Sequence, residues 1–119
     1  MIAFAKSDVG KARQMNQDYY YISGSDTNVH IYILADGMGG YNGGEVASKL
    51  ATTSTLSYIQ SNFESIPKEK EDILNLIKSA IEYANMVVYE KSNEDKKLEG
   101  MGTTIEVCLI YGRRSGDAL

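Results

Sequence analysis

Residues 29–40 read VHIYILADGMGG and contain the strongest structural signals in the sequence. The first seven residues, 29–35, are nearly all apolar or aromatic and include several β-branched side chains, which predicts a strand. Asp36 ends this strand, and three of the next four residues are glycine. Glycine lets a backbone adopt positive φ angles and approach a ligand closely. The stretch therefore predicts a strand that delivers a carboxylate to a glycine-rich loop.

A second strand is predicted directly before this one. Residues 18–23 read DYYYIS, and the turn-forming residues 24–28 predict a hairpin between the two strands. If the turn centres on residues 26–28, Asp18 lies opposite Asp36. Two carboxylates in directly opposite positions destabilise a sheet. A divalent cation between them would reverse that effect, because Mg²⁺ and Mn²⁺ prefer oxygen ligands.

The rest of the chain predicts two helices, two further strands and one charged loop. Helices are expected at 44–62 and 70–91, because apolar residues recur there at helical spacing. Strands are expected at 2–6 and 103–111, and the charged loop at 92–99.

The order of three strands, two helices and one strand predicts an α+β fold. Pro67 is expected in the first turn of the second helix, where proline is well tolerated. Both helices are amphipathic and must cover a sheet face. The other face, which also carries apolar residues, would then need a second sheet that this chain does not supply.

Composition excludes several classes of protein. The net charge of -4 and the pI near 4.9 argue against nucleic-acid binding, which needs a basic face. No apolar run approaches the about 20 residues that span a bilayer, and residues 1–6 turn polar too early for a secretory signal. The lone Cys108 forms no internal disulfide, and its place in a strand predicts buried packing. We expect a cytoplasmic protein.

Three segments resemble, in order, the motifs of one enzyme family. Residues 13–18 (RQMNQD), 35–48 (ADGMGGYNGGEVAS) and 100–104 (GMGTT) are similar to the motifs of the type 2C, metal-dependent serine/threonine protein phosphatases (PPM family), bacterial type. Their spacing is also family-like. The resemblance covers residues 1–111 as the N-terminal half of a catalytic domain. It implies part of a four-layer α-β-β-α sandwich, here with about four strands and two helices.

The resemblance also implies a role for each matching residue. Arg13 would grip the substrate phosphate, as suits its planar and permanently charged guanidinium. Asp36 would bridge two divalent cations, Mn²⁺ or Mg²⁺. The carbonyl of Gly37 would bind one of them, and Asp18 would lie close to the metals and act through bound water. The implied reaction is hydrolysis of phosphoserine and phosphothreonine in proteins by a water that two metals activate. A bacterial serine/threonine kinase is the expected functional partner.

The sequence departs from the family pattern in three places. Met38 and Tyr41 stand where many relatives have histidine, and the only histidine, His30, is expected to be structural or exposed, so no general acid is assigned. Family members continue with a Gly-Asp-Ser motif and two more metal-binding aspartates, which this chain lacks. Residues 112–119 are expected to form an irregular or non-family tail.

Three hypotheses about function stay open. The chain is a phosphatase, with activity of the isolated chain unsettled because later metal ligands are absent. Alternatively, it is a non-catalytic half-domain that binds a metal weakly or serves as an interaction module. A third hypothesis is self-association, because two copies could bury their open sheet faces against each other.

Overall fold

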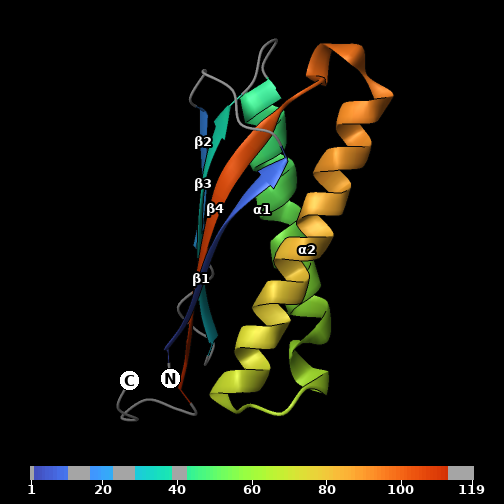
Figure 1. The fold of residues 1–119 in the computed structure, drawn as a ribbon. Coiled ribbons are helices and arrows are strands. Elements are labelled where there is room, and N and C mark those ends of the chain that lie inside the picture. Colours follow the sequence, from blue (N-terminus) through green and yellow to red (C-terminus); the bar gives the residue numbers. More distant parts are fainter. Residues whose placement is uncertain (1, 11–16, 23–28, 39–42, 113–119) are drawn as a thin grey trace.

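The computed structural model of this protein describes residues 2–10, 17–22, 29–38 and 43–112. At positions 8 and 10 and in 17–22 the description is of the backbone. These residues form one antiparallel sheet and a pair of helices, which confirms the predicted α+β class (Figure 1).

Four strands form the sheet in the order β1-β4-β3-β2. All three neighbouring pairs are antiparallel. β1 and β4, which come from opposite ends of the chain, therefore lie side by side. The strands are β1 (Ile2–Gly10), β2 (Gln17–Ile22), β3 (Val29–Met38) and β4 (Gly102–Tyr111).

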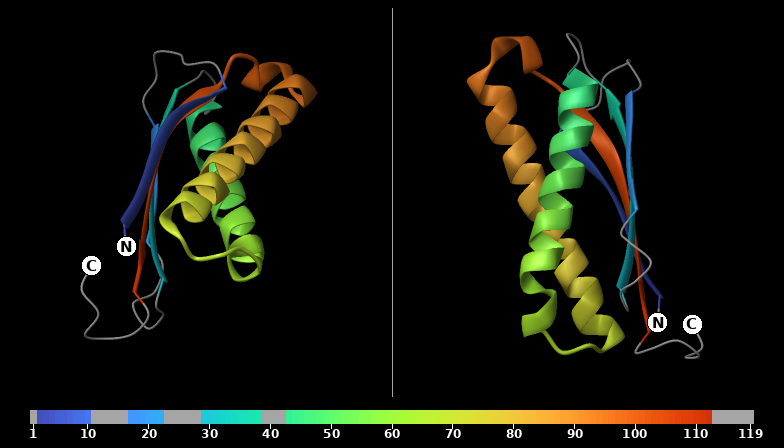
Figure 2. Two further views of the ribbon diagram at one scale, coloured as in Figure 1. Left: turned by 60° about the horizontal axis from the view of Figure 1, so that its bottom comes forward. Right: turned by 180° about the vertical axis from the view of Figure 1, so that it is seen from behind.

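Two long helices cover one face of this sheet. α1 (Gly43–Asn62) packs mainly on β3, and α2 (Lys70–Glu94) packs on β1 and along α1 (Figure 2). Of the helices in the described part of the chain, none has the length and apolarity that a membrane span needs. The core between the helices and the sheet consists of alternate strand residues and one stripe from each helix, including Ile33, Ala35, Ile105, Val107, Leu109, Ala47, Ala51, Ile59, Ile73, Ile77, Ala84 and Val88.

The predicted start of the second helix at residue 70 is confirmed, whereas the predicted place of Pro67 and the predicted end of the helix were wrong. α2 begins at Lys70, and its first hydrogen bond runs from the amide of Ile73 to the carbonyl of Glu69 (3.1 Å). Pro67 therefore lies in the connection before the helix instead of in its first turn. At the other end, α2 continues to Glu94, into the segment 92–99 that was predicted as a loop.

That segment also contains a 3₁₀ turn, Lys96–Leu98. The Asp95 carboxylate accepts a hydrogen bond from the amide of Lys97 (3.0 Å) at the start of this turn. Leu98 is buried among the core residues. Charge alone therefore misled the prediction, because an acidic cap and one apolar anchor are enough to order a short charged turn.

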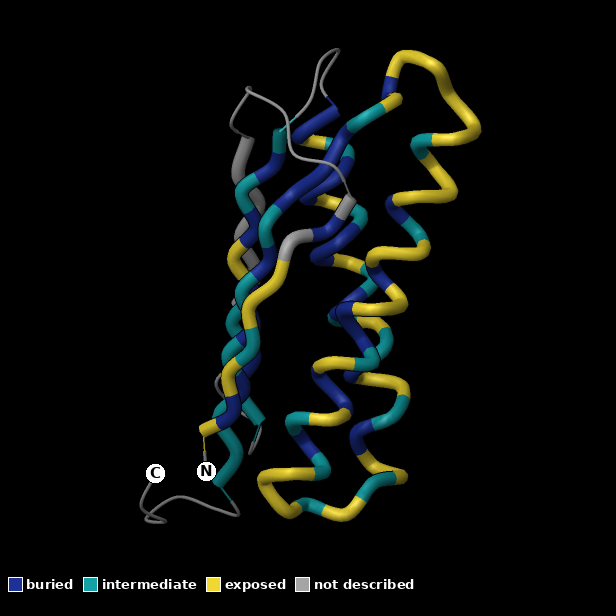
Figure 3. Tube along the Cα trace, in the orientation of Figure 1, coloured by how far each residue is buried: buried dark blue, intermediate teal, exposed yellow. Residues whose placement is uncertain are grey.

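No helix of the described residues covers the second face of the sheet (Figure 2), and we call it the open face. It is formed by the even-numbered positions of β1, β3 and β4, and the side chains described there are half-buried or exposed (Figure 3). Near Ile2 the face is apolar. Farther along the strands, Lys6 and Glu106 pair across β1 and β4 at 3.5 Å. Cys108 lies here, opposite Phe4 and Tyr32. It is half-buried, so the prediction that it packs in the buried core was wrong.

The inner face of α1 carries a stripe of small polar residues. Ser48, Thr52 and Thr55 are fully buried. The hydroxyl of Ser48 donates to the carbonyl of Glu45 (3.2 Å). The hydroxyls of Thr52 and Thr55 have no hydrogen-bond partner among the described residues. A buried hydroxyl without a partner loses its hydration and gains nothing in return.

Replacing Thr55 with valine should therefore stabilise the fold. The Thr55→Val variant keeps the branched shape and a similar helix propensity but removes the buried hydroxyl, so we expect the free energy of unfolding to rise by about 1 kcal/mol. Urea denaturation monitored by circular dichroism measures this change. Thr53→Val is the control, because Thr53 is exposed and its hydroxyl already donates to the carbonyl of Lys49 (2.9 Å). A loss of stability in Thr55→Val would contradict the argument.

Candidate metal and phosphate site

Asp36 lies two residues before the end of β3, on the open face. β3 is an inner strand, so Asp36 has a neighbour on each side. Asp18 on β2 and Thr104 on β4 are its direct register partners. The predicted hairpin register is confirmed, because Tyr20 pairs with Leu34 as well.

The same row of the sheet contains a third acidic position, which the sequence analysis missed. Asp8 on β1 pairs with Thr104. The row therefore reads Asp8, Thr104, Asp36 and Asp18 across all four strands, and we call it the acidic row. No local pattern could have identified Asp8. Its place depends on the pairing of β1 with β4, two strands separated by nearly the whole chain.

The chemistry of this row suits a hard cation. Asp36 is half-buried, and its Oδ1 atom is shielded from solvent. Backbone carbonyls, carboxylates and a threonine hydroxyl are all oxygen donors, which Mg²⁺ and Mn²⁺ prefer. Within the described residues, no group of three or more histidine, cysteine, aspartate or glutamate side chains is placed to hold a metal. The described side chains therefore form no such group around Asp36.

The segment before β4 brings the last strand to this site. Gly100 has a φ of 78°, which only glycine adopts without strain, and the amide of Met101 donates to the carbonyl of Leu98 (3.0 Å). Met101 is buried against the start of α1. This tight turn sets the register in which Thr104 lies beside Asp36.

The structure describes only some of the other predicted site residues. Gly37 follows Asp36 in β3 and is buried. Arg13 lies outside the described residues, as do residues 39–42 of the glycine-rich loop. His30 is half-buried opposite Ile110, at the other end of β3 from Asp36. The described residues therefore do not test the role of Arg13, and they keep His30 away from the acidic row.

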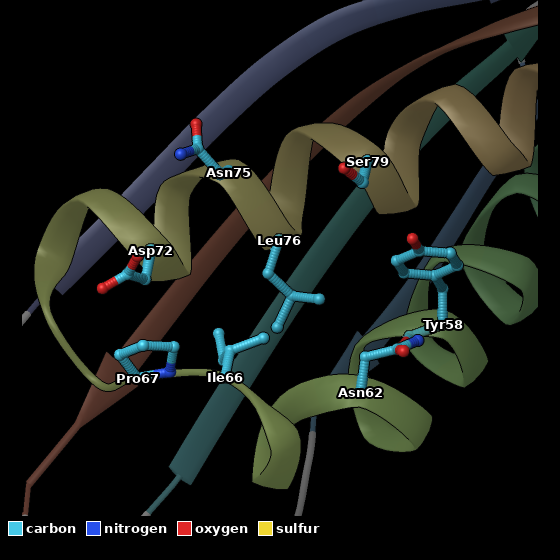
Figure 4. A pocket seen from close by; sticks show the side chains of 8 residues that line it. All are labelled: Tyr58, Asn62, Ile66, Pro67, Asp72, Asn75, Leu76 and Ser79. Atoms are coloured by element: carbon cyan, nitrogen blue, oxygen red, sulfur yellow. The ribbon is translucent and has the colours of Figure 1, made fainter.

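A cavity between the two helices is separate from this site. It measures about 270 Å³ and lies where α1 turns into α2, at the opposite end of the molecule from the last residues of β3 (Figures 1 and 4). Leu76 and Ile66 point into it, and Tyr58 and Asn62 line its α1 side. Asp72 is its only acidic lining residue. The cavity therefore lacks the several acidic positions that make the acidic row a candidate metal site.

Comparison with known proteins identifies the family. The sequence profile of protein phosphatase 2C matches residues 10–117, which is most of the chain. This chain belongs to the protein phosphatase 2C family. The motifs that suggested the resemblance, at 13–18, 35–48 and 100–104, all fall within the matched segment.

The matched relatives are bacterial protein phosphatases. The serine/threonine protein phosphatase PstP of Mycobacterium tuberculosis is 33% identical over 112 residues, which cover 94% of this chain and 20% of PstP. The protein phosphatase PhpP of Streptococcus pneumoniae is 32% identical over 112 residues, which cover 92% of this chain and 43% of PhpP. The chain thus spans less than half the length of these relatives.

Solved structures of phosphatases share the fold. A variant of a bacterial serine phosphatase is 32% identical, with a TM-score of 0.64 over 92% of this chain and 48% of that one. The catalytic domain of PstP, in complex with two manganese ions, is 27% identical, with a TM-score of 0.62 over 94% of this chain and 45% of that one. The sheet and helix pair described here are therefore part of the protein phosphatase 2C fold.

The acidic row predicts that divalent cations stabilise this family member. Adding Mg²⁺ at ten times its dissociation constant should raise the free energy of unfolding by about 1.4 kcal/mol, because the cation binds only the folded state. Asp36→Asn should abolish that increase. Without metal, the same variant should be at least as stable as the parent chain, because a repulsive charge is gone. Thermal unfolding in Mg²⁺ and in EDTA measures both effects.

Glu106→Gln is the matched control for this prediction. Glu106 is another acidic residue on the open face. It lies on β4, two residues after Thr104, and pairs with Lys6. Its variant should keep the response to Mg²⁺. An equal loss of the response in both variants would mean that the cation is attracted by the overall negative charge of the open face and does not bind at the acidic row.

Proposed function

We propose that this chain is the N-terminal half of a phosphoserine/phosphothreonine protein phosphatase domain. One observation carries the proposal: Asp36 lies near the end of a largely apolar strand, directly opposite Asp18 and shortly before the glycine-rich loop. Such a pair of carboxylate positions is unfavourable in a sheet unless a positive charge lies between them. The relatives PstP and PhpP are protein phosphatases, which supports a metal site for phosphoryl transfer at this position.

The predicted residues of this chain would have different roles at such a site. Two divalent cations, Mn²⁺ or Mg²⁺, would activate the attacking water and offset negative charge on the phosphoryl group. Asp36 would bind between the two cations, and the Gly37 carbonyl would bind one of them. Asp18 would hold a water molecule that hydrates the metals. Arg13 would bind the phosphate oxygens through its guanidinium fork and so orient the substrate.

The substrates of this site would be phosphorylated proteins in the cytoplasm. A bacterial serine/threonine kinase would then supply the phosphoryl groups that the phosphatase removes. The remaining metal ligands would come from the part of the domain that this chain does not span, since the chain covers less than half of PhpP. Turnover would therefore require both halves.

Activity should appear when the missing half is supplied, and it should depend on Asp36. We expect a chimera of this chain with the part of PhpP beyond the matched segment to hydrolyse a phosphothreonine peptide in Mn²⁺. Asp36→Asn should lower kcat/KM by more than about 100-fold, since even outer partners of metal ligands cost about 10–100-fold. Phosphate release measures the rate.

Asp72→Asn is the control for activity. Asp72 lines the helix cavity at the far end of the molecule, so this variant should keep full turnover. Activity of the chimera that survives EDTA, or that Asp36→Asn leaves unchanged, would contradict the proposed metal-dependent mechanism. A folded chimera that binds Mn²⁺ without hydrolysing the peptide would contradict the proposed reaction.

A second candidate function is an interaction module, and the open face favours it. Phe4 is 55% exposed, Ile2 48% and Leu34 42%, on the side of the sheet that no helix covers. Exposed apolar residues that gather on one face mark an interaction surface. In the isolated chain, a second copy could bury this face against its own, and the chain would then act as a metal-binding or dimerising half-domain.

Self-association through the open face predicts a concentration-dependent dimer that one charge disrupts. Phe4→Glu should shift the chain to monomer, because a carboxylate would be buried at the interface without a partner. Sedimentation velocity across a concentration series measures this. Tyr89→Glu is the control, since Tyr89 is 61% exposed but lies on the outer side of α2. A parent chain that stays monomeric throughout would exclude self-association.

A further inference from the structure

The first turn of α1 lies directly against the backbone that follows Asp36. Gly44 is buried there. A Cβ atom at position 44 would lie 2.7 Å from the carbonyl carbon of Gly37, 2.8 Å from its oxygen and 2.8 Å from the amide nitrogen of Met38. These three atoms form a single peptide unit. Distances under 3.0 Å are shorter than real Cβ contacts, so no side chain fits at position 44 unless that peptide moves.

The neighbouring Gly43 has different surroundings. A Cβ atom there would lie 3.1 Å from the Cβ of Met101 and 4.0 Å from its Cα, with no contact to β3 among its nearest neighbours. Two consecutive glycines in one helical turn therefore have separate partners. Gly43 faces the segment that leads into β4, whereas Gly44 faces the Gly37–Met38 peptide.

We propose that Gly44 is a positioning residue for the metal site. The inference rests on the proposed function, in which the carbonyl of Gly37 binds a cation. The direction of a backbone carbonyl is set by its peptide plane. The ladders to β2 and β4 hold the Gly37–Met38 peptide from the two sides within the sheet. On the helix side, the Cα atom of Gly44, which carries no side chain, packs against this peptide.

This contact matters for a cation because a rigid ligand shell tolerates little displacement. Mg²⁺ requires near-ideal octahedral geometry, and a productive site must be held within about 0.5 Å. A methyl group at position 44 must push the peptide outward by several tenths of an ångström to restore an ordinary contact. That movement would reach the Gly37 carbonyl first and the adjacent Asp36 next.

The test compares Gly44→Ala with Gly43→Ala in this chain. A titration with Mg²⁺, followed by NMR, reports on the carboxyl carbon of Asp36 and the carbonyl carbon of Gly37 separately. We expect Gly44→Ala to weaken Mg²⁺ binding by about 10-fold or more, the loss typical of residues that orient metal ligands. Gly43→Ala should stay within about twofold of the parent chain, because the side chain of Met101 can adjust.

The outcomes separate this inference from the proposed function. If Mg²⁺ leaves the Asp36 carboxyl signal of the parent chain unchanged, the metal site itself fails. If that signal shifts and a folded Gly44→Ala binds Mg²⁺ as tightly as the parent, only the role of Gly44 fails. An equal loss in both alanine variants would also overturn it, because helix packing in general would then be responsible.

Should Gly44→Ala not fold, the parent chain still decides the question. The Gly37 carbonyl carbon should shift together with the Asp36 carboxyl carbon during the Mg²⁺ titration. A shift at Asp36 alone would show that the carbonyl takes no part in binding, and the positioning role of Gly44 would be refuted without any variant.

Discussion

The main physical constraint on this structure is a cluster of acidic positions inside a regular sheet, whose repulsion the rest of the fold must offset. Asp18 and Asp36 are direct partners across β2 and β3, and Asp8 shares their row beyond Thr104. Like charges in such positions weaken a sheet. The surrounding strands offset this cost through fully buried residues such as Ile33, Ala35 and Ile105 on the opposite face. The sheet is stable because of its helix-covered face, while Asp36 lies on its open face.

The two faces of the sheet therefore have different roles. α1 and α2 bury most of the described residues of one face and form the core with them. The open face ends in acidic residues at one end of the strands and in apolar residues, including Ile2 and Phe4, at the other. An apolar surface of this kind suits a second layer of protein. The chain belongs to the protein phosphatase 2C family and spans less than half the length of the relatives PstP and PhpP.

Long periodic elements were predictable, and their ends were less so. The apolar stripes of α1 and α2 and the strands around Ile33 and Val107 follow from local sequence, because burial imposes a period of two or of 3.6 residues. Pro67 and the acidic residues after Ser92 gave misleading boundary signals. Helix ends depend on single hydrogen bonds, such as that from Ile73 to Glu69, which periodicity does not encode.

The sequence by itself determined the element order, the hairpin register that pairs Asp18 with Asp36, and the motifs that indicated the phosphatase family. These features are local, since each depends on residues close together in the chain. Only the tertiary structure decided that Asp8 joins the acidic row and that Cys108 lies on the open face. It alone showed that Gly44 touches the Gly37–Met38 peptide. Those features arise from the pairing of β1 with β4 and the packing of α1 on β3, and sequence spacing carries no information about such contacts.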